Sequence, residues 1–133
     1  MDWYLKVFKQ YADFSGRARR KEYWMFMFFH IMALTIAALL DYVLGISFNN
    51  GYYGWIYLAY GLFTMVPALA VSVRRLHDRG LSGWWYFIGI IPFFGAIGLF
   101  VLMCLDGEVK RNKWGDNPKG IGNYNSINQI GTE

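Results

Sequence analysis

Three apolar stretches, separated by short polar segments, dominate the chain. Residues 23–40, 52–73 and 84–105 contain no Asp, Glu, Lys or Arg. A helix of about 18 to 22 residues is about 27–33 Å long, which matches the hydrocarbon thickness of a bilayer. The pattern therefore predicts an all-α, polytopic membrane helical bundle with three transmembrane segments, at about residues 23–44, 52–73 and 84–105.

The third apolar stretch allows two arrangements. Ile91 and Pro92 lie near its middle, with Gly89, Gly95 and Gly98 around them. Because proline and glycine disrupt helices, the stretch forms either one kinked span or a re-entrant hairpin. Each arm of a hairpin would have about ten residues, or about 15 Å of helix, which is too short to cross. We therefore expect the single span.

The N-terminal segment predicts a helix of a different kind. Tyr4, Val7, Phe8 and Tyr11 recur at helical spacing within residues 2–14, and lysines lie between them. Basic and aromatic residues on a short amphipathic helix are typical of the membrane surface. We expect an interfacial helix over this segment; the alternative is a helix packed on the rest of the protein.

The composition also favours a membrane protein. The chain is 56% hydrophobic and 17% charged, whereas soluble domains are about 45–50% apolar and about 25% charged. A soluble domain of this size has too much surface to hide so much apolar material. Cys104 is the single cysteine, so an internal disulfide is excluded. We expect one membrane-embedded domain over residues 1–118 and a flexible polar tail over 119–133.

The distribution of positive charge predicts the topology. Of the 13 Lys and Arg residues, six precede the first span, none lies in the loop 45–51, three lie in the loop 74–83 and four follow residue 105. Cytoplasmic segments carry the excess of Lys and Arg, so three spans require a cytoplasmic N-terminus. A hairpin over 84–105 would place all thirteen inside. The net charge of +4 sits in blocks beside apolar spans, which favours anionic lipids over nucleic acid as the partner.

Three stretches carry a family resemblance. They are residues 14–24 (FSGRARRKEYW), residues 74–85 together with Pro67, and residues 104–118, which contain NKWG. In combination they resemble the DUF805 family of small bacterial inner-membrane proteins, a group without an assigned function.

The resemblance covers about residues 1–118 and implies an integral protein of the bacterial cytoplasmic (inner) membrane. It implies no reaction. Trp114 departs from the family pattern, which has Phe or Tyr there, and residues 108–111 do not form the expected glycine-containing turn.

Two basic clusters form the candidate site. A charge at the centre of a bilayer costs about 2.5–3.5 kcal/mol or more, but at the end of a span long side chains reach the headgroups. We expect these clusters to contact anionic lipid headgroups or a partner; the alternative is a topology signal alone. The residues are Arg17, Arg19, Arg20, Lys21, Arg74, Arg75, His77, Asp78 and Arg79.

Five polar positions suggest specific interactions. His77 and Asp78 can form a pair that titrates at about pH 6–7. Glu22 can pair with an arginine of the loop 74–83. We expect Asp41 to be a solvated residue at the end of the first span, and His30 to point into the bundle and donate a hydrogen bond.

No catalytic, cofactor-binding or metal-ligating constellation is found in the sequence. We therefore expect a non-enzymatic scaffold or interaction protein, whose partners are membrane lipids, a second copy or another membrane protein. The alternative is a small oligomeric transporter or channel, for which His30, Thr35, Thr64 and Ser72 offer few polar groups. An enzyme acting on lipid through His77 and Asp78 would lack a third catalytic group.

Overall fold

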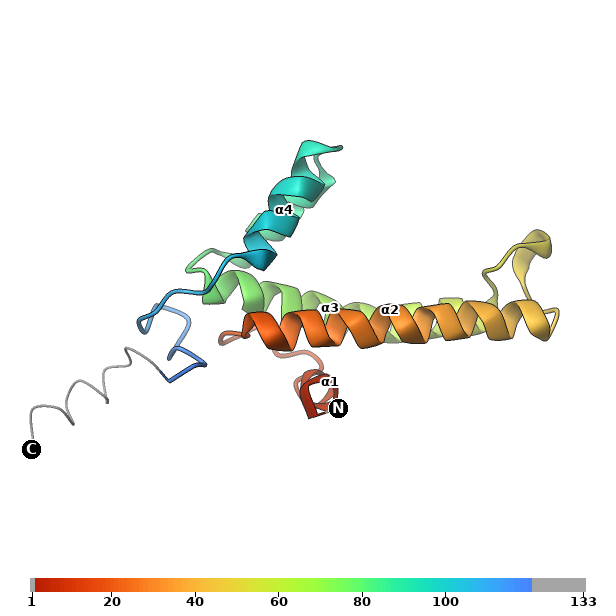
Figure 1. Ribbon diagram of the computed structural model, residues 1–133, viewed down its shortest axis with the longest axis horizontal. Helices are drawn as coiled ribbons and strands as arrows, with labels where there is room; N and C mark the ends of the chain where they lie inside the picture. Colours follow the sequence, from red (N-terminus) through yellow and green to blue (C-terminus); the bar gives the residue numbers. More distant parts are fainter. Residues whose placement is uncertain (1, 121–133) are drawn as a thin grey trace, which may run out of the picture.

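The described part of the chain, residues 2–120 of a computed structural model, is built from helices and connecting turns, with no strand (Figure 1). This confirms the all-α prediction. Most of the predicted tail, residues 121–133, lies outside the described residues. The elements in chain order are α1 (Asp2–Lys9), α2 (Arg20–Val43), η1 (Phe48–Asn50), α3 (Trp55–Asp78), η2 (Gly83–Ile90) and α4 (Phe94–Cys104).

Helices α2 and α3 form a long antiparallel pair (Figure 1). Each has 24 residues, and the mean hydropathy of its apolar window is 1.9 in α2 and 1.8 in α3, so both are long and apolar enough to cross a membrane. Only 11% and 28% of these windows are buried within the protein. A soluble core helix is mostly buried, so the exposed apolar side chains favour lipid as the surrounding solvent.

The third apolar stretch is a hairpin of two short helices, not the single span that we expected. Helix η2 ends at Ile90 and Pro92 lies in the turn. Phe93 has a φ of 67°, a value outside the right-handed helical region, so the helix cannot continue through it. At Gly95 a Cβ atom would overlap the carbonyl oxygen of Ile88, so glycine permits the close return of α4. At 8 and 11 residues, neither helix is long enough to span a bilayer. The hairpin rises at a steep angle from one end of the α2–α3 pair (Figure 1).

Helix α1 is shorter than the predicted segment 2–14 because the chain turns before Gly16. The Asp13 carboxylate accepts hydrogen bonds from the backbone N–H and the hydroxyl of Ser15, at 2.9 and 2.6 Å. Gly16 then takes a φ of 80°, a value that favours glycine. These interactions compete with a continuing helix, as is usual for Asp and Ser.

The apolar face of α1 packs against α2 and α3. Val7 is fully buried in a cluster with Phe26 of α2 and Val71 of α3, and the Tyr4 and Phe26 rings stack at 5.5 Å. The helical spacing predicted from the sequence therefore corresponds to a packed face. The location of α1 at the membrane surface stays a prediction.

Helix α3 passes through Pro67 without ending. Proline lacks an N–H, so the carbonyl of Phe63, four residues earlier, loses its helical partner. The hydroxyl of Tyr11 donates a hydrogen bond to this carbonyl. The segment after α1 thus supplies the interaction that Pro67 removes.

At the far end of the pair, Asp41 caps α3. Its carboxylate accepts hydrogen bonds from the backbone N–H groups of Gly54, Ile56 and Tyr57, at 3.0, 3.0 and 2.8 Å. Asp41 is fully buried, so the expectation of a solvated end residue was wrong. The carboxylate satisfies N–H groups that the first turn of a helix leaves unpaired, and its charge complements the helix dipole.

Candidate functional site

A buried cluster of two arginines and one aspartate lies where α2 begins and α3 ends. Arg17 Nε donates to Asp78 Oδ1 at 3.0 Å, and Arg75 Nη1 donates to Asp78 Oδ2 at 2.6 Å. The side chains of Arg17, Arg75 and Asp78 are 1%, 0% and 4% exposed. Arg75 and Asp78 are three residues apart on α3, a spacing that brings helical side chains together. Both carboxylate oxygens are occupied.

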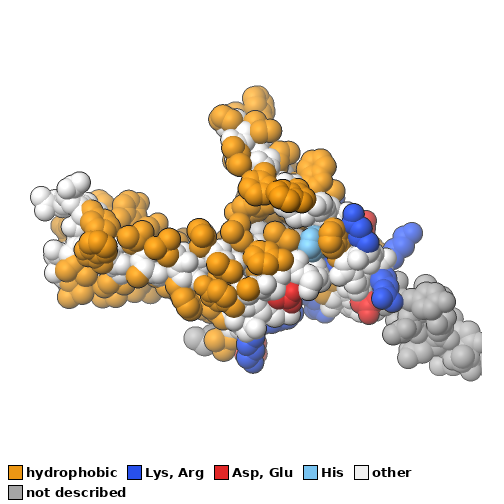
Figure 2. Space-filling view, turned by 180° about the vertical axis from the view of Figure 1, so that it is seen from behind, with side chains coloured by type: hydrophobic (Ala, Val, Ile, Leu, Met, Phe, Trp, Pro, Cys, Tyr) orange, Lys and Arg blue, Asp and Glu red, His pale blue; other side chains and the backbone are white. Residues whose placement is uncertain are grey.

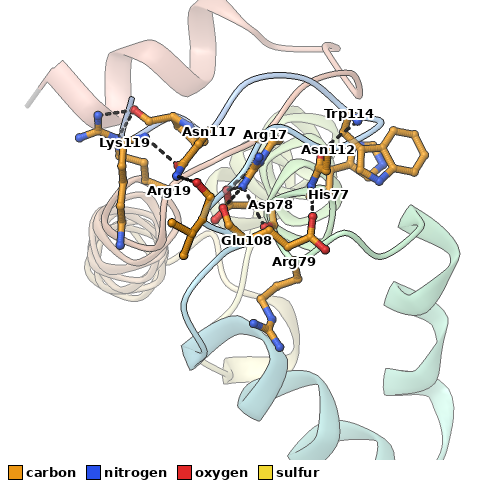
Figure 3. Close-up of polar contacts among 12 residues, drawn as sticks. Arg17, Arg19, His77, Asp78, Arg79, Glu108, Asn112, Trp114, Asn117 and Lys119 are labelled. Atoms are coloured by element: carbon orange, nitrogen blue, oxygen red, sulfur yellow. Dashed lines mark hydrogen bonds and ion pairs between the residues drawn. The ribbon is translucent and has the colours of Figure 1, made fainter. Parts of the chain in front are cut away.

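The other N–H groups of Arg17 reach the segment after α4 (Figure 3). Nη1 donates to the carbonyl of Lys110 at 2.7 Å, and Nη2 donates to the carbonyl of Glu108 at 2.6 Å. A guanidinium carries five donors in a fixed plane, so one buried arginine can satisfy several acceptors at once. Arg17 thereby links the N-terminal segment, α3 and the C-terminal segment.

Arg75 holds the end of the hairpin in the same way. It donates to the carbonyl of Met103 at 3.2–3.3 Å and to the carbonyl of Leu105. These carbonyls lie in the last turn of α4 and at the residue that follows it, where helical partners are lacking. The cluster therefore fixes where α4 ends relative to α3.

A second ion-pair group contains Glu22, whose side chain is fully buried. It pairs with Arg74 Nη1 at 3.3 Å and with Lys6 Nζ at 2.9 Å. Arg74 also donates to the side-chain oxygen of Gln10. The predicted pairing of Glu22 with an arginine of residues 74–83 is confirmed. These contacts join α1, α2 and α3 at their polar ends.

His77 and Asp78 do not pair. The His77 ring stacks on Trp114 with centroids 3.7 Å apart and 6° between the planes. Its Nδ1 lies 3.1 Å from the carbonyl of Gly16, so Nδ1 donates. Asn112 donates to the His77 carbonyl at 2.9 Å. Trp114, the departure from the family pattern, thus packs the C-terminal segment onto α3.

The nine predicted contact residues differ in exposure. Arg17, Arg74, Arg75, His77 and Asp78 are buried. Arg17 belongs to the segment before α2, and the other four are among the last residues of α3, so none of them lies in a solvated loop. Their burial within the protein does not fit the expected contact with lipid headgroups. Apart from the Arg75–Asp78 pair, their partners lie far away in the sequence, so the sequence does not reveal the burial.

The other four predicted residues remain accessible. Arg19 and Arg79 are partly exposed, and each donates to a backbone carbonyl, that of Pro118 and that of Asp106. Arg20 and Lys21 are exposed on the first turn of α2. A headgroup or partner can reach this group.

His30 lies between two rings of the bundle. Its ring stacks at 5.6 Å on Phe26 and at 5.7 Å on Tyr60. Tyr60 in turn shares a hydrogen bond of 2.7 Å with the hydroxyl of Tyr4. The inward orientation agrees with the expectation, but within residues 2–120 the His30 Nδ1 has no hydrogen-bond partner.

An apolar groove that sequence reasoning missed separates α2 from the hairpin. Its volume is about 560 Å³, and Tyr23 and Trp24 of α2 face η2 and α4 across it. The rings of Trp24 and Phe100 meet edge to face at 5.6 Å. The groove exists because residues 84–105 fold back. In the sequence, this reversal was indicated only by Pro92 and the glycines on either side of it, Gly89 and Gly95.

Comparisons with known proteins give a consistent result. The family described as "Protein of unknown function (DUF805)" matches residues 11–116. The chain is 44% identical over 119 residues to "Inner membrane protein YhaH" of Escherichia coli K12, covering 90% of this chain and 98% of the relative. It is 42% identical over 119 residues to "Inner membrane protein YhaI" of the same strain, covering 90% and 97%. No solved structure matches the chain.

Proposed function

Because the chain belongs to the DUF805 family, whose relatives named above are inner membrane proteins, we propose that it is a non-enzymatic interaction protein with a basic cytoplasmic face. This face contacts anionic lipid headgroups or a membrane partner. One observation carries the proposal: all 13 Lys and Arg residues belong to segments that meet at one end of the α2–α3 pair. Figure 2 shows charged side chains gathered on that half and apolar side chains over the other.

The proposed topology has two spans and a re-entrant hairpin. Helices α2 and α3 cross, and η2 and α4 enter from the charged side and return to it. The N-terminus and Lys119 then lie in the cytoplasm. The excess of Lys and Arg on cytoplasmic segments supports this arrangement, because every positive charge falls on one side.

The contact face consists of exposed basic residues at the polar end. These residues attract anionic lipids without burying a charge in hydrocarbon. They are Arg20, Lys21, Lys110, Arg111, Lys113 and Lys119. The first two belong to the set expected from sequence; the other four are added because the C-terminal segment folds against Arg17 and Arg19.

The hydroxyl groups of the two spans favour this function over a channel. Thr35, Thr64 and Ser72 donate to carbonyls of their own helices, those of Ile31, Tyr60 and Ala68, at 2.7–2.9 Å. The single donor of each hydroxyl is thus used within its own helix, which leaves few donors to line a polar pathway. The charged residues of α3 gather in its last turns rather than along its length.

Spin-labelled lipids test the proposal. The protein is reconstituted into vesicles, and electron paramagnetic resonance measures the motionally restricted fraction of labelled phosphatidylglycerol and phosphatidylcholine. We expect a preference for phosphatidylglycerol that weakens as salt rises, because exposed charges are screened. Combined Lys21→Gln, Lys110→Gln and Lys113→Gln should reduce the preference.

Asn50→Gln, at the uncharged far turn, is the matched control and should leave the preference unchanged. Equal restriction of both lipids by the unmodified protein at low salt would contradict the lipid-contact form of the proposal.

A further inference from the structure

The groove between α2 and the hairpin has the dimensions and lining of a ligand site. Ligand pockets are typically about 300–1,000 Å³ and mostly apolar, and this one is about 560 Å³. Tyr23 and Trp24 form one wall, and Ile90, Leu99 and Phe100 lie on the other. At Gly89 a Cβ atom would lie 3.2 Å from Leu99, so the glycine keeps the space open.

Positive charge lies at one end of this groove. Arg20 lies one helical turn before Trp24 and therefore on the same face of α2. Its Nη1 donates to the carbonyl of Cys104 at 3.2 Å, next to the Met103 side chain that lines the groove. The Arg20 side chain is 50% exposed, so a ligand outside the protein can reach it.

One carboxylate competes for these charges. Asp106 lies 3.6 Å from Arg20 and 3.3 Å from Lys119 Nζ. The hydrogen bond from Lys119, and then the charge of Arg20, hold the pKa of Asp106 below its ordinary value. Asp106 is therefore ionised at neutral pH, and Arg20, Lys119 and Asp106 leave one net positive charge before Lys21 is counted.

A second groove provides a comparison within the same protein. It has a volume of about 400 Å³ and lies at the far end of α2, between Leu34, Ala38 and Leu39 and the tyrosines at positions 52, 53 and 57. No Lys or Arg occurs in residues 31–57. Both grooves offer apolar walls, but only the groove beside the hairpin has a cationic mouth.

We propose that the groove beside the hairpin holds one acyl chain of an anionic phospholipid, whose phosphate is bound by Arg20. The site rests on the proposed function, because it requires the charged end to face a leaflet. The acyl chain lies between Trp24 and the α4 side chains Leu99 and Phe100. The charge complementarity between the cationic mouth and a phosphate selects a lipid over a second copy of the chain.

Native mass spectrometry of the detergent-purified protein tests the proposal. Dioleoyl phosphatidylglycerol and dioleoyl phosphatidylcholine are titrated separately, because they share acyl chains and differ in head-group charge. We expect one saturable phosphatidylglycerol adduct per chain. Arg20→Gln should lower the affinity for phosphatidylglycerol about five- to tenfold, to that for phosphatidylcholine, because a charge-assisted contact is lost.

Further variants distinguish binding of the acyl chain in the groove from binding of the phosphate at its cationic end. Ala96→Phe fills the groove and should lower the affinity for both lipids about tenfold or more. Ala38→Phe, the matched control, fills the far groove and should change neither. Asp106→Asn should raise the affinity for phosphatidylglycerol alone, because it removes the carboxylate that competes with the phosphate for Arg20.

An adduct that survives both Arg20→Gln and Ala96→Phe would overturn the proposal, and so would a protein dimer that Ala96→Phe abolishes while lipid adducts persist. If the spin-label preference is intact while the groove variants have no effect, the lipid site is wrong and the basic contact face stands. If the unmodified protein prefers neither lipid in either experiment, both the lipid site and the lipid-contact form of the proposed function fail.

Discussion

The hydroxyl group of Tyr11 replaces the hydrogen bond that Pro67 takes from α3. Tyr11→Phe keeps the ring and leaves the Phe63 carbonyl without its partner. We expect a loss of about 0.5–1.5 kcal/mol in the free energy of unfolding, the typical net contribution of one intramolecular hydrogen bond. Unfolding in mixed micelles measures it. Tyr42→Phe, at a residue that is 57% exposed, should be neutral, and equal stability of the two variants would refute this role.

Asp78 is the single carboxylate between two buried guanidinium groups. Asp78→Asn preserves the shape but leaves Arg17 and Arg75 without a counter-charge. Removing one partner from a buried ion pair costs about 3–5 kcal/mol, so we expect a loss of that size or failure to fold.

Thermal unfolding in detergent measures the effect of Asp78→Asn. The matched control is Asp116→Asn, whose side chain is 53% exposed and pairs with Arg111 at the surface. A destabilisation no larger than that of the control would show that the buried cluster does not hold the polar end together.

The turn between α2 and α3 depends on Asp41 and on the absence of a side chain at Gly54. A Cβ atom at Gly54 would lie 2.7 Å from Asp41 Cγ. Asp41→Ala removes the cap from the first turn of α3, and we expect a cost of about 0.5–2 kcal/mol. Hydrogen exchange should accelerate at residues 54–57 and stay unchanged in α4. Unchanged exchange at residues 54–57 would contradict the capping role.

The long helices could be predicted from sequence, whereas the hairpin could not be decided. Uncharged runs identified α2 and α3, because length and hydropathy suffice for a helix of bilayer length. Residues 84–105 form an equally apolar run, yet the chain reverses at Phe93 through a positive φ. Pro92 and Gly95 signalled a break, but the direction of the chain after it depends on Arg75, which holds the end of α4 from another helix.

The charged residues show a second limit of sequence reasoning. Arg17 was expected to contact lipid headgroups or a partner, since long basic side chains usually reach the headgroups. Its burial depends on carbonyl groups of residues 108 and 110, more than ninety residues away, and no periodic pattern reveals such partners. The pairing of Glu22 with Arg74 was predictable because both lie at the charged end of neighbouring helices.

The distribution of charge over the whole molecule predicts which residues can be labelled from outside the cell. In a Cys104→Ser background, cysteine replaces Asn50, Phe93 or Lys113 in turn. We expect a membrane-impermeant maleimide added to intact cells to react at Asn50→Cys alone. Lys113→Cys should react only after the membrane is opened, because in the proposed topology the hairpin returns the chain to the cytoplasm.

The label on Lys113→Cys decides between the two arrangements of residues 84–105. Reaction from outside would mean that the segment crosses the membrane and that the hairpin is not the native topology. Reaction of Phe93→Cys from outside, with Lys113→Cys still protected, would mean that the tip reaches the opposite surface.

The position of Arg17 has a consequence for biosynthesis. This residue is translated more than ninety residues before Glu108 and Lys110, whose carbonyl groups complete its hydrogen bonds. A nascent chain that already contains both long helices still holds a guanidinium group lacking its final acceptors. Closure of the polar end therefore follows the synthesis of both long helices, and chains that terminate before residue 108 should be preferred substrates of membrane quality-control proteases.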